Sequence, residues 1–346
     1  MIDKNKIFAI FMESALGTEF GKMGEGVMRY SPNPICCVID TRHAGKTVRQ
    51  AVGSPFDVPV VATIEEGVVL GAEVLVLGIA PSGGKFPDTW DAPMEKALKN
   101  GLSLINGLHD SLNSRFGHLL DKTNPSQLIW DVRTPKPSYP IARARAAKYD
   151  NKRVLMVGTD MAVGKMTTGI EIYRWLKEQG ISTDFLATGQ IGITVTGKGI
   201  PLDAVKVDQA AGAVEELVLT AKDIDVVIIE GQGSLGHPGS TATLPLMRGS
   251  CATHLILCHR AGMKTNFDNP DIKIPPLKEF IALNEAVARV GGSLTTATCV
   301  GVALNTFHMT VEEAKAEIEK VEQETGLPAT DVIRFGAEKL GRAILG

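Results

Sequence analysis

Hydrophobic residues in this chain gather in short runs rich in Val, Ile and Leu, and stretches with helical spacing separate most of them. Such runs indicate buried β-strands, and apolar positions three or four residues apart indicate helices. In the first half, strands are predicted at residues 7–12, 35–40, 73–80, 103–106 and 128–131, and helices at 64–70, 93–99 and 110–121. This alternation is typical of an α/β domain with a parallel sheet covered on both faces.

The second half of the chain repeats the alternation. Strands are predicted at residues 153–157, 183–187, 226–230, 254–258 and 299–304, and helices at 166–179, 209–220, 276–290, 311–324 and 329–345. Between the halves, residues 134–140 contain three prolines, which resist both a helix interior and a central strand. We therefore expect two α/β domains, residues 1–138 and residues 139–346.

Composition narrows the function classes. A hydrophobic content of 44% and a charged content of 22% are ordinary for globular proteins, and a net charge of −3 gives no support for nucleic-acid binding. No apolar run approaches the roughly 20 residues that span a bilayer. The five cysteines are odd in number and show no CxxC spacing, which favours a reduced environment. We expect a cytoplasmic protein with no nucleic-acid or membrane partner.

The most informative segment follows the predicted strand at residues 153–157. A loop that begins at Gly158 ends in Gly164-Lys165 at the start of a predicted helix. Backbone N–H groups of such a loop and of the helix N-terminus bind phosphate, and the lysine adds a positive charge. The residues assigned to this phosphate loop are Gly158, Thr159, Asp160, Val163, Gly164, Lys165, Met166, Thr167 and Thr168.

Two departures from the common P-loop affect its interpretation. The loop has one extra residue between its glycines, and Met166 stands where the motif places a Ser or Thr that holds Mg²⁺. A thioether is a poor ligand for a cation that prefers oxygen. Thr167 and Thr168 either offer a hydroxyl or cap helical N–H groups. The sequence therefore predicts a phosphate-bearing ligand and weakens the case for Mg²⁺·ATP hydrolysis.

A carboxylate and a histidine follow the predicted strand at residues 226–230. Glu230 ends the apolar run, and a glycine-rich stretch leads to His237. In phosphate-binding folds the neighbouring strand often ends in an acidic residue near the phosphates. Both residues are candidate general bases, although a solvated glutamate in a surface turn and a surface histidine are the alternatives.

Three further residues are candidates for binding a substrate, all placed after predicted strands. Gln190 could hydrogen-bond an amide or carboxylate, and Arg133 and Arg260 could hold a carboxylate. Cys251, His254, Cys258 and His259 do not have the spacing of a structural zinc site, so no metal is expected. In the first half, residues 78–85 form a second strand-end loop that closes in Gly-Lys. Either an anion-binding loop or a long connector fits this segment.

The loop resembles a known phosphate loop. Gly158-Thr159-Asp160 and Val163-Gly164-Lys165 are similar to those of dethiobiotin-synthetase-like P-loop proteins. Two further motifs strengthen a more specific resemblance: Ala187-Thr188-Gly189-Gln190-Ile191-Gly192 and Ile229-Glu230-Gly231-Gln232-Gly233-Ser234-Leu235-Gly236-His237-Pro238. With them, the chain resembles over essentially its full length a family long catalogued as a domain of unknown function, which includes DgcN-type D-glutamate N-acetyltransferases.

The resemblance implies a Rossmann-like N-terminal domain followed by a P-loop NTPase-like domain. It also implies an N-acetyltransferase that moves acetyl from acetyl-CoA to the α-amine of an amino acid, D-glutamate above all, with the phosphate loop holding the CoA phosphates. A homo-oligomer, a dimer, is expected. The alternative is an ATP- and Mg²⁺-dependent ligase or kinase-like enzyme that resembles dethiobiotin synthetase, against which Met166 argues.

Overall fold

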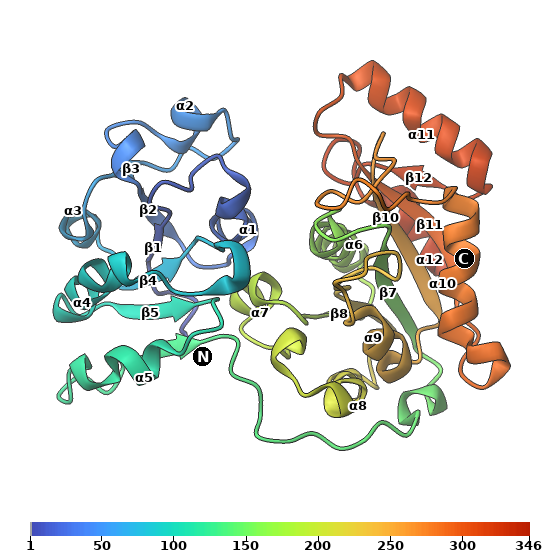
Figure 1. Ribbon diagram of the computed structural model, residues 1–346, viewed down its shortest axis with the longest axis horizontal. Helices are drawn as coiled ribbons and strands as arrows, with labels where there is room; N and C mark the ends of the chain where they lie inside the picture. The colour runs from blue at the N-terminus through green and yellow to red at the C-terminus, as the bar shows by residue number, and fades with distance from the viewer. Residues whose placement is uncertain (1) are drawn as a thin grey trace. The chain divides into compact units, whose positions relative to one another are not determined.

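The computed structural model describes residues 2–346, which fold as two compact units. The first unit comprises the chain up to Pro135 together with Gln190–Ala204, and the second comprises Lys136–Gly189 and Val205–Gly346. Each unit is built on a six-stranded sheet in which all pairings are parallel (Figure 1). The predicted α/β class with two parallel sheets is confirmed. The division between residues 138 and 139 stays a prediction.

The sheet of the first unit has the strand order β3-β2-β1-β4-β5-β6. Its strands are β1 (Phe8–Phe11), β2 (Ile35–Ile39), β3 (Val60–Val61), β4 (Val74–Leu77), β5 (Ser103–Asn106) and β6 (Ile129–Asp131). The central strands β1, β4 and β5 are buried along their whole length, as expected for strands that helices cover on both faces. The helices are α1 (Lys22–Tyr30), α2 (Val48–Val52), α3 (Ile64–Val69), α4 (Asp91–Lys99) and α5 (Leu112–Phe116).

A helix from the second half of the sequence completes the first unit. This helix, α7 (Gln190–Thr196), packs against α1 within the unit (Figure 1). The contact is close, because a Cβ added to Gly26 of α1 would lie 2.5 Å from Cγ2 of Ile191. Gly26 therefore allows α1 and α7 to approach each other, and the hydrophobic pattern gives no sign of this insertion.

The sheet of the second unit has the strand order β12-β11-β10-β7-β9-β8. Its strands are β7 (Lys152–Gly158), β8 (Thr183–Leu186), β9 (Val226–Ile229), β10 (His254–Arg260), β11 (Thr298–Asn305) and β12 (Ala329–Thr330). The helices are α6 (Lys165–Glu178), α8 (Val207–Leu219), α9 (Thr243–Ser250), α10 (Leu277–Arg289), α11 (Val311–Thr325) and α12 (Glu338–Leu345). The central β7 ends at Gly158, so its loop opens at the carboxyl edge of the sheet, where parallel sheets bind ligands.

Two predicted helices are wrong in extent. The helix predicted at residues 329–345 is a strand, β12, followed by a loop and by the shorter α12. Asp331 explains the break, since its carboxylate accepts hydrogen bonds from the backbone N–H and the hydroxyl of Thr306 after β11 (2.9 and 2.6 Å). The helix predicted at residues 110–121 is only α5 and a following 3-10 turn.

Candidate active site

The loop between β7 and α6 has the backbone geometry of an anion site. Ala162 and Gly164 adopt the left-handed conformation, with φ of 55° and 105°. Gly164 is the N-cap of the 14-residue α6, and no side chain caps the N–H groups of the first turn. Uncapped N–H groups at a helix N-terminus carry a partial positive charge and bind anions. The strain at Ala162 is of the kind that gathers at functional loops.

Lys165 lies buried inside this loop. Its Nζ donates to the backbone oxygen of Asp160 at 2.7 Å, and a Cβ on Gly158 would lie 2.9 Å from Nζ. Burial lowers the pKa of Lys165 to about 8, and the nearby carboxylates of Asp160 and Glu230 oppose this shift only in part. The ammonium group is therefore poorly solvated, and an anion in the loop would stabilise its charged form.

Asp160 connects the phosphate loop to the segment that follows β10. Its Oδ1 accepts the backbone N–H of Met161 at 2.6 Å, and its Oδ2 accepts the backbone N–H of Phe267 at 2.8 Å. The carboxylate is buried. Because both oxygens accept hydrogen bonds from the backbone, this aspartate holds the loop in place.

The remaining predicted loop residues form its base and its first helical turn. The Thr159 hydroxyl pairs with Nδ1 of His259 at 2.9 Å, and Thr168 hydrogen-bonds the thiol of Cys258. Burial lowers the pKa of His259 to about 4, so its imidazole is neutral at pH 7. Val163 is buried, and Met166 and Thr167 are half-buried in the first turn of α6. His259 stood out in the sequence only as part of a rejected metal set.

Glu230 lies directly after β9 and positions the neighbouring turn. Its Oε2 accepts the backbone N–H groups of Thr188 and Gly189 at 2.8 and 3.0 Å. The next residue, Gly231, passes so close to β7 that an added Cβ would lie 1.6 Å from the backbone oxygen of Met156. The carboxylate is thus fixed beside the phosphate loop, with its Oε2 ordering the turn at Thr188 and Gly189.

Both ring nitrogens of His237 have partners. Nε2 lies 2.9 Å from Oδ1 of Asp268, and Nδ1 accepts the backbone N–H of Gly239 at 3.1 Å. These contacts assign the proton of the neutral ring to Nε2. The same hydrogen bond lowers the pKa of Asp268. His237 would accept a proton at Nδ1 only after its bond to Gly239 breaks.

Arg260, at the end of β10, is the predicted substrate-binding residue that lies beside the phosphate loop. Its Nη2 donates to the backbone oxygen of Ala162 at 3.3 Å. The guanidinium is flanked by the rings of Phe267 and Phe307, with 5.4 and 5.9 Å from Cζ to the ring centroids. Its Nε is buried without a hydrogen-bond partner in residues 2–346.

Arg133 and Gln190 belong to the first unit. Nη1 of Arg133 pairs with Oδ2 of Asp203 at 2.8 Å and contacts the imidazole of His109. Gln190 begins α7, and its Cγ would lie 3.3 Å from a Cβ on Gly107, which follows β5. The sequence placed Gln190 at the same sheet edge as Lys165, but the chain leaves the second unit at Gly189.

One histidine that sequence reasoning missed has the arrangement of a general base. His43 Nδ1 lies 2.7 Å from Oδ2 of the fully buried Asp40, which follows β2. This contact fixes the ring, and its Nε2 has no partner in the described part of the chain. A carboxylate that orients an imidazole in this way is a common feature of proton-transfer sites. The signal available in the sequence was an aspartate at a strand end, three residues before a histidine.

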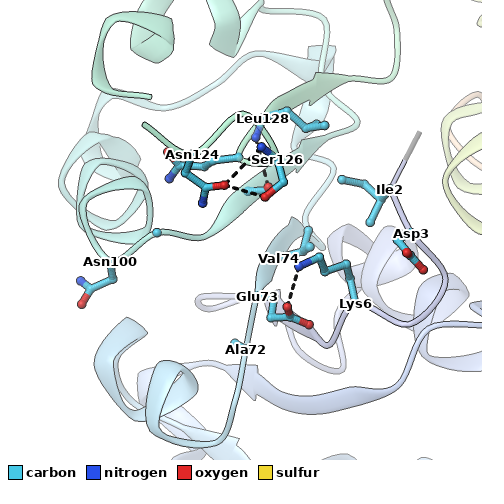
Figure 2. A pocket seen from close by; sticks show the side chains of 13 residues that line it. Ile2, Asp3, Lys6, Ala72, Glu73, Val74, Asn100, Asn124, Ser126 and Leu128 are labelled. Carbon is cyan, nitrogen blue, oxygen red and sulfur yellow. Dashed lines mark hydrogen bonds and ion pairs between the residues drawn. The ribbon is translucent and has the colours of Figure 1, made fainter. Parts of the chain in front are cut away.

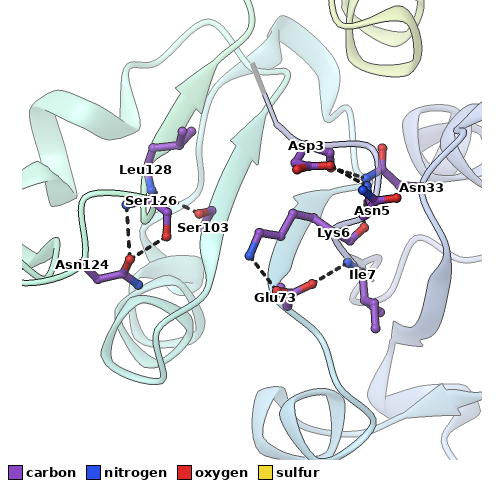
Figure 3. Close-up of polar contacts among 10 residues, drawn as sticks. All are labelled: Asp3, Asn5, Lys6, Ile7, Asn33, Glu73, Ser103, Asn124, Ser126 and Leu128. Atoms are coloured by element: carbon purple, nitrogen blue, oxygen red, sulfur yellow. Dashed lines mark hydrogen bonds and ion pairs between the residues drawn. The ribbon is translucent and has the colours of Figure 1, made fainter.

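A cavity of about 520 Å³ lies elsewhere in the first unit, at the amino ends of β4 and β5 (Figure 2). Its polar groups are mostly paired with one another. Lys6 bonds Glu73 at 2.6 Å, and Glu73 also accepts the backbone N–H of Ile7, while Asn124 bonds Ser126 (Figure 3). Ligands of parallel sheets bind at the carboxyl edge instead. The cavity is therefore a poor candidate for the active site.

Residues 2–346 have neither a metal-binding cluster of side chains nor a membrane-spanning helix. They contain no group of three or more His, Cys, Asp or Glu side chains arranged to hold a metal ion. No helix in the same residues has the length and apolar character required to cross a membrane.

Comparisons with known proteins agree with both halves of the fold. The family described as "Domain of unknown function (DUF1611_C) P-loop domain" matches residues 140–341, and "Domain of unknown function (DUF1611_N) Rossmann-like domain" matches residues 41–135. The crystal structure of a DUF1611 family protein from Anabaena variabilis has a TM-score of 0.94 and 47% sequence identity and covers 99% of each chain.

Two curated relatives carry a functional name. A D-glutamate N-acetyltransferase from Tritonibacter scottomollicae is 38% identical over 283 residues, which are 82% of this chain and 84% of that protein. A second D-glutamate N-acetyltransferase, from Pseudoalteromonas sp., is 35% identical over 281 residues, 80% of this chain and 83% of that protein.

Proposed function

This chain belongs to the DUF1611 family, and on that premise we propose that it is an N-acetyltransferase that transfers acetyl from acetyl-CoA to the α-amine of D-glutamate. The names of the two relatives support the reaction and the acceptor. A homodimer and a cytoplasmic location stay predictions.

The role proposed for the second unit rests on the position of Lys165. This lysine is buried in the loop before α6, and the first turn of α6 has N–H groups that no side chain caps. Coenzyme A carries a pyrophosphate and a 3′-phosphate, and such a loop binds phosphate through backbone donors and one cation. This binding mode requires no hydroxyl after the lysine, so Met166 is compatible with it. We assign Gly158–Thr168 to the CoA phosphates.

The reaction requires an unprotonated amine. A base takes one proton from the substrate ammonium, and the nitrogen lone pair attacks the thioester carbonyl carbon to give a tetrahedral intermediate. The C–S bond then breaks to release the CoA thiolate, the nitrogen gives up its second proton as the amide forms, and that proton neutralises the thiolate. Glu230 is the first candidate base because it is fixed beside the phosphate loop, and His237 is the second. Arg260, Arg133 and Gln190 are the candidates for holding the acceptor's carboxylates.

A thermal-shift experiment tests this function against the ATP-dependent alternative. Only ligands that bind the native state raise the melting temperature. We expect CoA and acetyl-CoA to stabilise the protein without added metal, and excess chelator to leave the shift unchanged. Stabilisation by ATP that strictly requires Mg²⁺, with none by CoA, would instead indicate a ligase or kinase-like enzyme.

A further inference from the structure

Two phenyl rings stand exposed at the carboxyl edge of the second sheet. Phe267 is 65% exposed and Phe307 is 69% exposed, and the guanidinium of Arg260 lies against both rings. Isolated exposed apolar side chains are ordinary, but two exposed aromatic rings that contact one arginine place stacking faces beside a cation. We call these three residues the aromatic platform.

The backbone that carries the aromatic platform is anchored on both sides. The N–H of Phe267 donates to Asp160 of the phosphate loop at 2.8 Å, and Arg260 donates to the oxygen of Ala162 in the same loop. The backbone N–H of Phe307 donates to Oδ1 of Asn305 at 3.3 Å, and its oxygen accepts from Arg334 at 3.2 Å. The rings are therefore presented next to the phosphate loop by an ordered backbone.

The aromatic platform also contains a donor that lacks an acceptor. Nε of Arg260 is buried without a partner in residues 2–346, although one of its terminal nitrogens bonds Ala162. A buried N–H without a partner is unfavourable, so a ligand that brings an acceptor to Arg260 gains affinity. The site thus offers two ring faces and one charged donor to a ligand that is flat, aromatic and anionic.

We propose that Phe267, Phe307 and Arg260 form the subsite for the adenosine part of coenzyme A, with adenine stacked on the phenyl rings and a phosphate oxygen bound by Arg260. This proposal rests on the proposed function, and it assigns Arg260 to the cofactor, which leaves Arg133 and Gln190 as the candidates for holding the acceptor's carboxylates. Adenine is the one planar aromatic group of coenzyme A, whereas its pantetheine arm is flexible and not aromatic. The phenyl rings have no hydrogen-bonding groups, so the aromatic platform recognises the nucleobase by stacking alone.

The proposal is tested by comparing a ligand that contains adenine with one that lacks it. Calorimetry would measure the Kd of coenzyme A and of inorganic pyrophosphate, without metal, for the wild type, F267A and F307L. Phe20→Ala is the matched control, because Phe20 is a partly exposed phenylalanine of the first unit. Stacking on an aromatic side chain contributes roughly tenfold to a hundredfold in affinity per base. We expect each platform variant to weaken coenzyme A binding at least tenfold and to leave pyrophosphate binding unchanged.

Three results would overturn the subsite. Unchanged coenzyme A affinity in both variants, in a wild type that binds coenzyme A, would reject the platform and leave the proposed function intact. If the variants weaken pyrophosphate binding as much as coenzyme A binding, the rings only support the phosphate loop. A wild type that binds ATP but not coenzyme A would reject the occupant and the proposed function together. F307L keeps apolar bulk without a ring, so its loss of affinity would not come from an unfolded loop.

Discussion

Two loops in this chain begin and end alike, yet only one of them has its lysine at the start of a helix. Gly78–Lys85 and Gly158–Lys165 both leave a buried parallel strand at a glycine and close seven residues later in Gly-Lys. In the first unit, Lys85 is exposed and extended, with φ of −83° and ψ of 146°, and α4 begins only at Asp91. In the second unit, Lys165 is buried and is the first residue of α6.

The residues after each lysine account for the difference. Pro87 follows Lys85 by two residues, and a proline disfavours the helical conformation of the residue before it, Phe86. No proline interrupts α6 after Lys165. A strand, a glycine and a Gly-Lys pair therefore do not suffice to place the lysine at a helix N-terminus. The helix must begin at the lysine, so that its uncapped N–H groups and the ammonium face the same space.

The largest difference is expected in kcat, between variants that replace the carboxylates beside the two loops. Glu230 accepts N–H groups beside the phosphate loop, and Asp110 accepts the N–H of Phe86 at 2.7 Å in the first unit. As the base, Glu230 would contribute about 10²–10⁴-fold in rate. We expect Glu230→Gln to lower kcat by that factor, with partial recovery at high pH where free amine accumulates, and Asp110→Asn to stay near the wild type.

Steady-state kinetics with both substrates saturating would measure this contrast. If Glu230→Gln and His237→Ala both retain near-normal kcat at neutral pH, the base is neither of them. His43, whose ring Asp40 orients, would then be the next residue to replace.

A second contrast concerns how tightly each loop region is packed. A Cβ at Gly231 would lie 1.6 Å from the backbone oxygen of Met156, whereas Gly83 has open space and only a left-handed φ of 77°. We expect Gly231→Ala to cost more than about 3 kcal/mol of unfolding free energy or to prevent folding. Gly83→Ala should cost about 1 kcal/mol. Urea midpoints of the two variants would measure the difference, and equal midpoints would contradict the packing described for Gly231.

A third comparison is between the cofactor affinities of two variants, in each of which one of the two lysines is replaced. A charge-assisted hydrogen bond contributes about 1.5–3 kcal/mol, which is roughly 10–150-fold in affinity. We expect Lys165→Met to raise the Kd and KM for the CoA substrate by a factor in this range, and Lys85→Met to leave both unchanged. A folded Lys165→Met variant with wild-type affinity would show that the phosphate loop does not bind the CoA phosphates.

The smallest expected effect is a pH dependence of the affinity for coenzyme A, which comes from Lys165 and has no counterpart at Lys85. Its pKa of about 8 in the free protein is lowered by burial, and a bound phosphate would raise that pKa. Affinity for coenzyme A should therefore be constant below about pH 8 and fall by up to about tenfold per pH unit above it, because the free protein then loses the proton that binding requires. Titrations of the wild type and Lys165→Met from pH 6.5 to 9.5 would show the decline only in the wild type.

The long strands and the phosphate loop could be predicted from the sequence because their signals are local. Hydrophobic runs such as Val226–Ile229 and the order strand, loop, Gly-Lys, helix require no knowledge of distant residues. The strands β3 and β12 were missed, since each has only two residues and exists through its pairing with a neighbour.

The surroundings of two predicted site residues depended on contacts between distant segments. Gln190 follows a strand of the second unit in sequence but packs with the first unit, where Gly26 and Gly107 leave room for α7. His237 was predicted as a general base or a surface histidine, and nothing in the sequence indicated Gly239 and Asp268 at its two nitrogens. Hydrophobic periodicity reports which face is buried, and it contains no information on such polar pairings.

Acetyl transfer in the presence of a chelator tests the proposed function and its metal-free cofactor binding together. Purified protein with acetyl-CoA, D-glutamate and excess EDTA should form N-acetyl-D-glutamate and free CoA in equal amounts, measured by mass spectrometry and by a thiol reagent. Lys165→Met should require a higher acetyl-CoA concentration for the same rate. A wild type that forms no acetylated product under these conditions, and instead consumes ATP only when Mg²⁺ is present, would contradict the proposed acetyltransferase function.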